Sequence, residues 1–481
     1  MRIAASSIKF GTDGWRGLIA ADFTFERLSL VAPLAAKVLR DTYGNDTDTN
    51  TIIVGYDRRF MAENFAERTA EVVAEAGFDV LLSESYAPTP AFSWAAKQQN
   101  SLGALVITAS HNPGGYLGLK VKGSFGGSVA PEITKKIEDL LALPLAASES
   151  SGSLKTFDPW LSYCEGLRTK VELSKIQELI RQGKLTVFAD VMHGAAASGL
   201  SRILEVPIQE VNSSRDPLFG GGAPEPLPRY LSQLQRLIRT HKRQEPGSLR
   251  IGLVFDGDSD RIAAVDGEGN FLSSQILIPI LIEHLAAGRQ FTGEVVKTLS
   301  GSDLIPRVAQ LYQLPVYETP IGYKYIADRM LSTKTLLGGE ESGGIGYGNH
   351  IPERDALLSA LYLLEAIANS GLDLSDLYKS LQKLTGYTSA YDRIDLHLSG
   401  MEVRARLLEQ LQNETFKEID GQQVVDCQTT DGYKFRLAND SWLLIRFSGT
   451  EPVLRLYCEA PTLEKARHTL NWAKNWANSV Q

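Results

Sequence analysis

The chain has 481 residues, of which 49 are Lys or Arg and 57 are Asp or Glu, so its formal net charge is −8. With 43% hydrophobic and 22% charged residues it has a globular composition, which excludes bulk disorder, a fibre or a coiled-coil rod. Since domains usually have about 100 to 200 residues, a chain of this length is expected to form three or four domains. The acidic balance gives no support to nucleic-acid binding, which normally needs a basic face. An anionic ligand would therefore need a local basic pocket.

Cysteine usage and apolar runs point to a cytoplasmic protein. Cys164, Cys427 and Cys458 form no CxxC or CxxH pattern, and so sparse and odd a set argues against a secreted disulfide framework. The opening MRIAASSIKFGTDGW has no apolar core before its glycines, so no signal peptide is expected. Later apolar runs are too short to cross a bilayer. We expect a soluble protein with no membrane partner.

The first periodic patterns predict α/β units. Residues 51–54 are β-branched, 64–76 carry apolar residues at helical spacing, and 78–82 are apolar again, which predicts strand, helix and strand. Strand-like runs, each before a polar or glycine-containing turn, recur at 104–107, 185–188 and 251–255. Repetition of this pattern favours an α/β architecture.

Later segments predict core helices, loops and a last unit. The apolar runs at 276–285 and 356–366 are typical of core helices. A Ser- and Ala-rich stretch at 144–158 and a break at 369–375 indicate boundaries. A Gly- and Pro-rich loop is expected at 212–228 and a polar connection at 241–248. The chain then ends in predicted strands at 443–447 and 454–459 and an amphipathic helix at 463–477.

The sharpest motif is FDGDSDR at 255–261, directly after an apolar strand. Asp256, Asp258 and Asp260 stand at alternate positions, so on extended backbone their carboxylates project to the same side. Three like charges repel at that spacing unless a cation lies between them. All-oxygen ligands favour Mg²⁺ or Ca²⁺ over zinc. The alternative is a solvated acidic turn.

A second motif, TASHNP at 108–113, also follows an apolar strand. Its Asn-Pro pair predicts a turn that leaves Ser110 exposed at a strand end, where a nucleophile belongs. His111 is adjacent, but neighbouring side chains on extended backbone diverge, so we expect no hydrogen bond between the two. Lys120 could aim its ammonium group at the same loop as base, acid or phosphate ligand. Ser and Asn in loops also serve turns, which is the alternative.

Two glycine-containing motifs suit sugar and phosphate. GGEESGG at 338–344 offers carboxylates and a hydroxyl for bidentate bonding to vicinal sugar hydroxyls, or is a surface turn. RFSGTEP at 446–452 combines an Arg, hydroxyls and a Gly into an anion cradle, or is a hairpin turn. Arg455 lies three residues beyond it, and Arg16 and Lys324 sit beside glycines elsewhere.

FGTDGWRG, TASHNP, DGDSDR, GEESGG and RFSGTEP follow one another in that order over nearly the whole chain. This set closely resembles the α-D-phosphohexomutase family, which includes phosphoglucomutase and phosphomannomutase. The resemblance implies three related α/β domains with mixed sheets and a smaller C-terminal α+β domain around a central cleft. We expect these domains at 1–148, 149–255, 256–370 and 371–481, with a metal loop at 256–261.

The resemblance also implies roles for the motif residues. Ser110 is the phosphoserine nucleophile, and its phosphate and the three aspartates bind Mg²⁺. Lys120 and His111 fall where the family keeps its acid and base groups, and Arg261 supports the reacting phosphate. Glu340 and Ser342 hold sugar hydroxyls. The phosphate-binding residues are Arg16, Gly322, Lys324, Arg446, Ser448, Gly449, Thr450 and Arg455.

The implied reaction interconverts glucose 1-phosphate and glucose 6-phosphate, with a hexose 1,6-bisphosphate as intermediate and activator. The GEES and TPIGYKY segments look like those of glucose-preferring members, and mannose phosphates are candidate second substrates. Small hexose phosphates are the expected partners of a monomer or weak oligomer. One alternative is a glucose-1,6-bisphosphate synthase with another phosphoryl donor. The others are an aspartyl-nucleophile phosphatase using Asp256, against which Asp260 counts, and a non-catalytic sugar-phosphate-binding protein.

Overall fold

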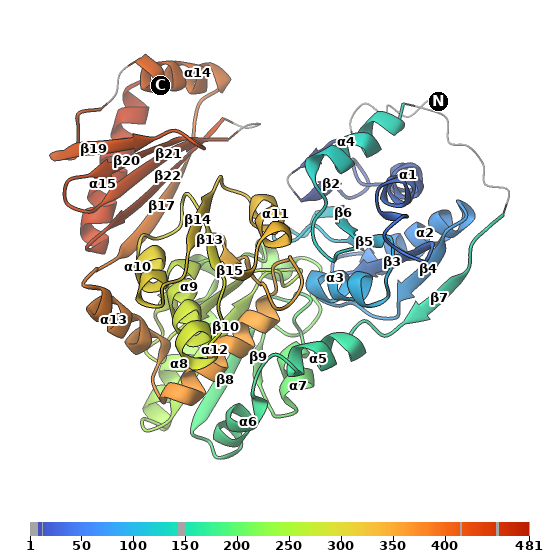
Figure 1. Ribbon diagram of the computed structural model, residues 1–481, viewed down its shortest axis with the longest axis horizontal. Coiled ribbons are helices and arrows are strands. Elements are labelled where there is room, and N and C mark those ends of the chain that lie inside the picture. Colours follow the sequence, from blue (N-terminus) through green and yellow to red (C-terminus); the bar gives the residue numbers. More distant parts are fainter. Residues whose placement is uncertain (1–7, 12, 143–149, 414–415, 449–451, 481) are drawn as a thin grey trace.

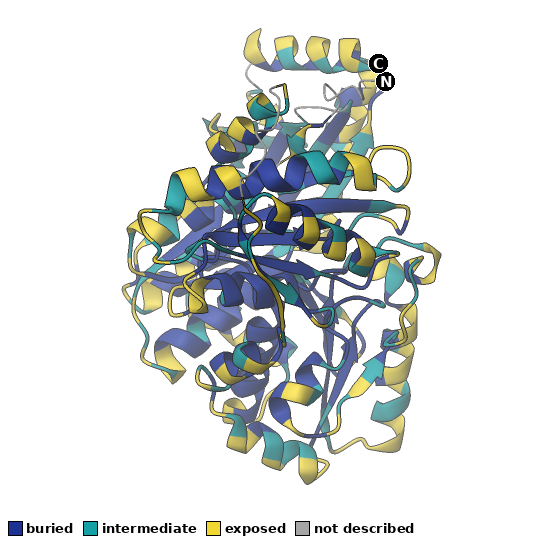
Figure 2. Ribbon diagram, turned by 90° about the vertical axis from the view of Figure 1, so that its right-hand side faces the viewer, coloured by how far each residue is buried: buried dark blue, intermediate teal, exposed yellow. Residues whose placement is uncertain are grey.

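The computed structural model describes residues 8–11, 13–142, 150–413, 416–448 and 452–480, and arranges them around four sheets (Figure 1). The first and fourth sheets lie at opposite sides of the molecule, with the third between them. Most central strands are buried, and exposed residues follow the outer sides of the helices (Figure 2). Three units are α/β with mixed sheets and the last is α+β, which confirms the expected fold class.

The first unit has a seven-stranded mixed sheet. Parallel neighbours need a crossover, and α2 and α3 supply it, so the pattern predicted at 51–82 is confirmed. α2 buries Phe65, Thr69 and Val73, which share one helical face. In sheet order the strands are β1 (Phe10–Gly11), β2 (Gly14–Leu18), β6 (Tyr116–Gly123), β5 (Gly103–Ile107), β3 (Thr51–Tyr56), β4 (Asp79–Ser83) and β7 (Leu154–Phe157). The helices are α1 (Phe25–Tyr43), α2 (Ala62–Glu75), α3 (Thr89–Gln98) and α4 (Pro131–Leu140).

The second unit has a five-stranded mixed sheet in which β8 runs parallel to β10 and β9. Its strands in sheet order are β12 (Phe271–Leu272), β11 (Ile262–Val265), β10 (Leu249–Phe255), β8 (Leu185–Asp190) and β9 (Gln209–Val211). Its helices are α5 (Leu161–Arg168), α6 (Leu173–Arg181), α7 (Gly199–Leu204) and α8 (Ser232–Gln244), with short turns η2 (Phe219–Gly221) and η3 (Pro228–Tyr230).

The polar connection predicted at 241–248 is wrong in its first half, because α8 continues to Gln244. Leu234 and Ile238 are buried on the inner face of this helix. The last turn is basic, with His241, Lys242 and Arg243. Positive charge at this end stabilises the helix, because the C-terminal end of the helix dipole is negative. The polar residues at 241–244 therefore end a helix, and the connection that follows it is short.

Two sheets extend past predicted boundaries. β7 pairs with β4, so the first sheet continues beyond residue 148. β11 and β12 pair with β10, so the boundary predicted after residue 255 falls inside a hairpin of the second sheet, and 256–261 is its loop. Composition marks where a chain turns polar, but it does not record which strands pair, whether they are adjacent, as β10 and β11 are, or distant, as β4 and β7 are.

The third unit has four strands, namely β14 (Val316–Thr319), β13 (Glu294–Thr298), β15 (Thr335–Gly339) and β16 (Ile345–Tyr347). Its helices are α9 (Ser274–Glu283), the π-helical turn η4 (His284–Gly288), α10 (Leu304–Leu311), α11 (Tyr323–Ser332), α12 (Ala356–Ser370) and α13 (Leu374–Thr385). α9 and α12 are buried along most of their length, which confirms the predicted core helices. Within the described residues, only α12 and α13 together reach the length and apolarity of a membrane span, and that pair is bent by 77°.

The fourth unit has an antiparallel sheet of β17 (Ala390–His397), β22 (Val453–Ala460), β21 (Trp442–Phe447), β20 (Tyr433–Leu437), β19 (Gln422–Gln428) and β18 (Glu418–Ile419). Its helices α14 (Met401–Asn413) and α15 (Leu463–Ser479) share a separate apolar core with one face of that sheet. Another apolar cluster runs through the first three units. A small apolar cluster around Leu299 and Trp442 lies where the fourth unit meets the third.

Candidate active site

The loop that carries Ser110 follows β5 and is held by a buried arginine. Arg59 Nη2 donates to the carbonyl oxygens of Ser110 and Asn112, each at 2.6 Å. The Ser110 amide donates to Thr108 Oγ1 at 2.9 Å, and that hydroxyl donates to Asp57 Oδ2 at 2.6 Å. Sequence reasoning missed Arg59 and Asp57, although the charged segment GYDRR directly after the predicted strand at 51–54 was a signal.

The structure corrects two expectations about Ser110. The serine is buried, with 1% exposure, because the loop of the second sheet covers it; a Cβ on Gly257 would lie 2.4 Å from the Ser110 carbonyl oxygen. Ser110 Oγ also lies 3.3 Å from His111 Nδ1, within hydrogen-bond distance. The expected divergence fails because Ser110 has a left-handed φ of 52° and not extended backbone.

Asp256, Asp258 and Asp260 form an aspartate triad whose ligand oxygens lie within 4.8 Å of one another. The predicted convergence is confirmed, but a tight turn with Ser259 at φ 61° produces it instead of extended backbone. All three carboxyl groups are fully buried, and the Oδ1 atoms of Asp258 and Asp260 have no hydrogen-bond partner within the described part of the chain. Buried carboxylate oxygens that accept no hydrogen bond fit a hard divalent cation such as Mg²⁺.

Contacts inside the triad distinguish its members. Asp256 Oδ1 accepts the amides of Asp260 and Arg261 at 3.0 and 3.1 Å, which closes the turn. Ser110 Oγ donates to Asp256 Oδ2 at 3.2 Å. Burial, together with the charges of Asp260 and Asp258, raises the pKa of Asp256 well above its ordinary value. The triad therefore needs cations nearby to remain ionised.

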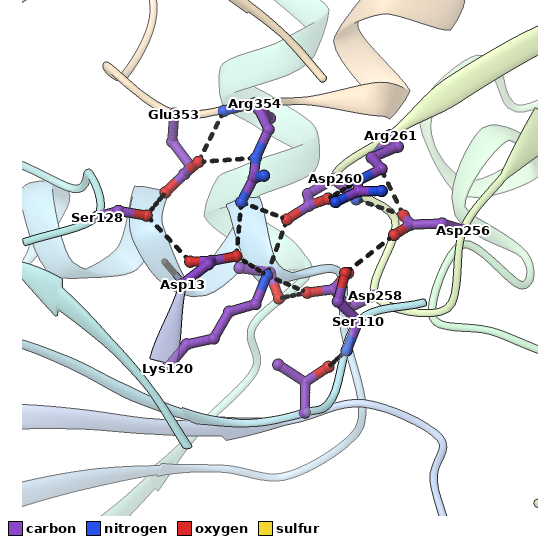
Figure 3. A network of polar contacts seen from close by, with 12 residues as sticks. Asp13, Ser110, Lys120, Ser128, Asp256, Asp258, Asp260, Arg261, Glu353 and Arg354 are labelled. Carbon is purple, nitrogen blue, oxygen red and sulfur yellow. Dashed lines mark hydrogen bonds and ion pairs between the residues drawn. The ribbon is translucent and has the colours of Figure 1, made fainter. Parts of the chain in front are cut away.

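Lys120 on β6 is one of these cations. Its Nζ lies 2.8 Å from Oδ2 of Asp258 and of Asp260, and 2.7 Å from Asp13 Oδ2 (Figure 3). Burial lowers the pKa of this lysine, but the three carboxylates outweigh burial and raise its pKa above the ordinary value. Lys120 is therefore protonated and can donate to an oxygen in the site.

Asp13 and Arg354 connect the three α/β units at this point. Arg354 Nη2 lies 2.7 Å from Asp13 Oδ2 and 2.9 Å from Asp260 Oδ2. Beside it, Glu353 Oε2 accepts from Lys122 Nζ at 2.6 Å. Sequence reasoning assigned none of these four residues to the site. The signals were Asp13 inside FGTDGWRG and the charged PERD directly before a predicted core helix.

Arg261, Arg16 and His111 surround the nucleophile loop. The backbone of Arg261 forms an isolated antiparallel β-bridge with that of Gly344, which joins the loop of the triad to the GEESGG loop. Arg16 Nη1 donates to Asn112 Oδ1 at 2.7 Å. The charge of Arg261, burial and the charge of Arg16 lower the pKa of His111 far below its ordinary value. His111 is thus neutral in this arrangement and can share a hydrogen bond with Ser110 Oγ.

The polar side chains of the GEESGG loop point in two directions. Ser342 Oγ donates to Glu340 Oε1 at 2.6 Å, and Arg354 Nη1 lies 3.8 Å from the same oxygen. Glu341 turns the other way, and its Oε2 accepts from Ser300 Oγ at 2.6 Å. The structure therefore brings Glu340 and Ser342, but not the Glu341 carboxylate, next to the group that contains Ser110.

The expected phosphate ligands lie in two places. Arg446 and Arg455 are directly paired across β21 and β22, and such a like-charged pair favours an anion between them. Ser448 follows β21, while Gly449 and Thr450 lie outside the described residues. Gly322 precedes α11, and Lys324 in its first turn lines a cavity of about 380 Å³ together with Asp13. Among the described residues, no hydrogen bond or ion pair joins Arg446 or Arg455 to the Ser110 group.

Comparison with known proteins gives the same relationship over the whole chain. Four family models match: phosphoglucomutase/phosphomannomutase α/β/α domain I at 7–143, domain II at 162–269, domain III at 273–384 and the C-terminal domain at 402–471. A phosphoglucosamine/phosphogalactosamine mutase of Sulfurisphaera tokodaii is 30% identical, over 97% of this chain and 98% of its own. A phosphoglucomutase/phosphomannomutase of Thermococcus kodakarensis is 28% identical, over 96% of each chain. A solved structure from Thermus thermophilus, assigned to the phosphomannomutases, has a TM-score of 0.83 at 32% identity and covers 98% of this chain and 99% of its own.

Proposed function

The chain belongs to the phosphoglucomutase/phosphomannomutase family, and we propose that it interconverts glucose 1-phosphate and glucose 6-phosphate through a phosphoserine at Ser110. Members of this family are phosphohexomutases, so the chain is an enzyme that moves a phosphoryl group within a sugar. The observation that carries the proposal is the contact of Ser110 Oγ with Asp256, inside a buried cluster of three carboxylates and Lys120.

The charges of the cluster suit phosphoryl transfer. A phosphoserine adds about −1.5 to −2 at neutral pH, next to three carboxylates. Mg²⁺ held by the triad and a Ser110 phosphate oxygen would offset charge on the transferring group. Lys120, Arg261 and Arg354 supply the remaining positive charge from the chain itself. Neutral His111, 3.3 Å from Ser110 Oγ, is placed to orient the serine hydroxyl through a hydrogen bond.

The remaining motifs provide the two ends of the substrate site. In this proposal Glu340 and Ser342 bind sugar hydroxyls, and Arg446, Ser448, Gly449, Thr450 and Arg455 bind the phosphate that does not react, with Arg16, Gly322 and Lys324 supporting the phosphate regions. The bisphosphate formed by transfer from phospho-Ser110 reorients in the site, and its other phosphate is then returned to the serine. Mg²⁺ and a hexose 1,6-bisphosphate are the implied cofactors.

The engaged carboxylates support a neutral hexose as substrate. Glu340 is held by Ser342 and lies near Arg354, and Glu341 is bonded to Ser300. A sugar hydroxyl can share the Glu340 carboxylate with these partners, because a carboxylate accepts several hydrogen bonds. An ammonium group would instead place a second positive charge next to Arg354 at the same carboxylate. Glucose phosphates are therefore the proposed substrates, although similar proteins are named for glucosamine phosphates. Mannose phosphates remain candidate second substrates, and a cytoplasmic monomer or weak oligomer stays a prediction.

The test uses the purified protein with Mg²⁺ and a trace of glucose 1,6-bisphosphate. Turnover of glucose 1-phosphate should exceed that of mannose 1-phosphate and glucosamine 1-phosphate, and the reverse order would contradict the glucose assignment. Accumulation of bisphosphate from another phosphoryl donor, without mutase turnover, would indicate the synthase. Labelled phosphate should map to the Ser110 peptide, and Ser110→Ala should abolish turnover. Label on Asp256 in an active Ser110→Ala variant would indicate the phosphatase.

A further inference from the structure

Asp431 links the third and fourth units at the proposed phosphate site, and none of the motifs includes it. It lies in the turn between β19 and β20. Its Oδ1 accepts from Arg446 Nε at 2.9 Å, and its Oδ2 accepts from the Ile321 amide at 2.8 Å. Ile321 directly precedes Gly322 and lies three residues before Lys324. One carboxylate therefore contacts both segments expected to bind phosphate.

The turn is shaped to bring Asp431 over β21. Gly432 has a φ of 94°, and a Cβ at this position would lie 2.6 Å from the Ile445 carbonyl oxygen. Only glycine accepts both the left-handed conformation and this close approach. The next residue on β21 is Arg446, so the tight turn places the carboxylate beside its guanidinium.

An apolar contact between the third and fourth units holds Ile321, the second partner of Asp431. Ile321 packs on the cluster of Leu299, Trp442, Leu444 and Tyr457, which joins the third unit to one face of the fourth sheet. Leu444 and Arg446 are two residues apart on β21, so their side chains lie on the same face of the sheet. The hydrogen bond to the Ile321 amide thus lies at the edge of the contact between the units, next to Arg446.

We propose that Asp431 is a positioning residue that orients Arg446 and ties it to the segment 321–324, so that both segments bind one phosphate group. Its bond through Nε uses one of the five guanidinium N–H donors and fixes the plane in which the others point. The guanidinium group is then already oriented for a phosphate, so binding does not cost the conformational entropy of ordering a long side chain. This inference rests on the proposed role of Arg446 as a phosphate ligand.

The experiment compares Asp431→Asn with the wild type and with Asp426→Asn, a change at an exposed position on β19 of the same unit. The asparagine keeps an oxygen for the Ile321 amide but removes the charge that holds Arg446. We expect the KM for glucose 1-phosphate and the inhibition constant of orthophosphate each to rise about tenfold, the effect of losing a charge-assisted hydrogen bond. The kcat should stay within about threefold, because a non-reacting phosphate is bound equally before and in the transition state. Asp426→Asn should leave all three constants unchanged.

A double variant separates positioning from a structural role. In an Arg446→Gln background, Asp431→Asn should raise the KM by less than about twofold, because the charge of Asp431 acts through Arg446. Unchanged phosphate affinity in Asp431→Asn, tighter phosphate binding, or a full additional effect in the double variant would each overturn the inference while leaving the proposed function intact. If Arg446→Gln alone left KM and orthophosphate inhibition unchanged, the phosphate site of the proposed function would fail as well.

Discussion

Ser110 donates a hydrogen bond from Oγ to Asp256 Oδ2 at 3.2 Å, and this contact joins the loop of the first sheet to the loop of the second. Both side chains are buried, with exposures of 1% and 0%. Burial and the neighbouring aspartates raise the pKa of Asp256 well above its ordinary value. Cations at this point therefore decide both the charge of the cluster and the surroundings of the serine hydroxyl.

The first prediction concerns the metal. Asp258→Asn should weaken Mg²⁺ binding by about tenfold or more, because it replaces one of three charged ligands of a hard cation. Calorimetric titration of Mg²⁺ into the protein measures this affinity. Asp266→Asn is the matched control, because Asp266 accepts the amide of Asn270 in the turn after β11 and lies outside the triad. Equal Mg²⁺ affinity in Asp258→Asn and the wild type would contradict the assignment of the site.

The second prediction separates the roles of two buried lysines on one face of β6. Lys120→Met should lower kcat about a hundredfold or more, because it removes a proton donor that contacts Asp258 and Asp260. Lys122→Met, which breaks the pair with Glu353 instead, should retain most of kcat. Steady-state kinetics and thermal unfolding of both variants give the comparison. A similar fall in kcat for the two variants would show that Lys120 acts only through stability.

The third prediction concerns the joint between the first three units. Arg354→Met should lower the free energy of unfolding by about 3–5 kcal/mol, because Asp13 and Asp260 lose a buried positive partner. Arg354→Lys should recover only part of that loss, since an ammonium group lacks the planar fork of arginine.

The control for this change is Arg329→Met, which removes a partly exposed pair with Glu294. That change should lower stability far less than Arg354→Met does, because exposed ion pairs contribute little to stability. Thermal unfolding of all three variants provides the measurement. A loss in Arg354→Met no larger than in Arg329→Met would mean that the buried network does not hold the units together.

The fourth prediction is a pH dependence at the contact between the third and fourth units. Lys434 is fully buried, and its Nζ donates to the Leu299 carbonyl oxygen at 2.7 Å. Burial, with the charge of Lys297, lowers the pKa of Lys434 from 10.5 to about 7, although Asp303 and Glu318 oppose the shift. Between these two values the unfolded chain binds more protons than the folded chain, so folding stability rises with pH.

The melting temperature of the wild type should therefore rise relative to that of Lys434→Met between pH 7 and pH 9. The gain is at most about 1.4 kcal/mol per pH unit, and below pH 7 the difference should be constant. Differential scanning calorimetry over this range checks the trend, with Lys417→Met at an exposed position of the same unit as control. A difference that stays flat from pH 7 to pH 9 would contradict the prediction.

The sequence by itself determined the elements and the motif-bearing loops. Apolar runs at 104–107 and 251–255 became β5 and β10, and the loops after them carry Ser110 and the triad. Periodicity and turn chemistry are local properties, so a chain read segment by segment reveals them. Within these two loops, local reasoning failed where it assumed extended backbone, since Ser110 and Ser259 adopt left-handed conformations.

Only the tertiary structure decided which charges meet. Arg354 donates to Asp13 across 341 positions of the chain, and Asp431 reaches the Ile321 amide across 110. No local pattern encodes such pairs, because they depend on how finished units pack against one another. A buried charge nevertheless requires a partner, and the packing of four units supplies that partner from whichever segment lies nearest.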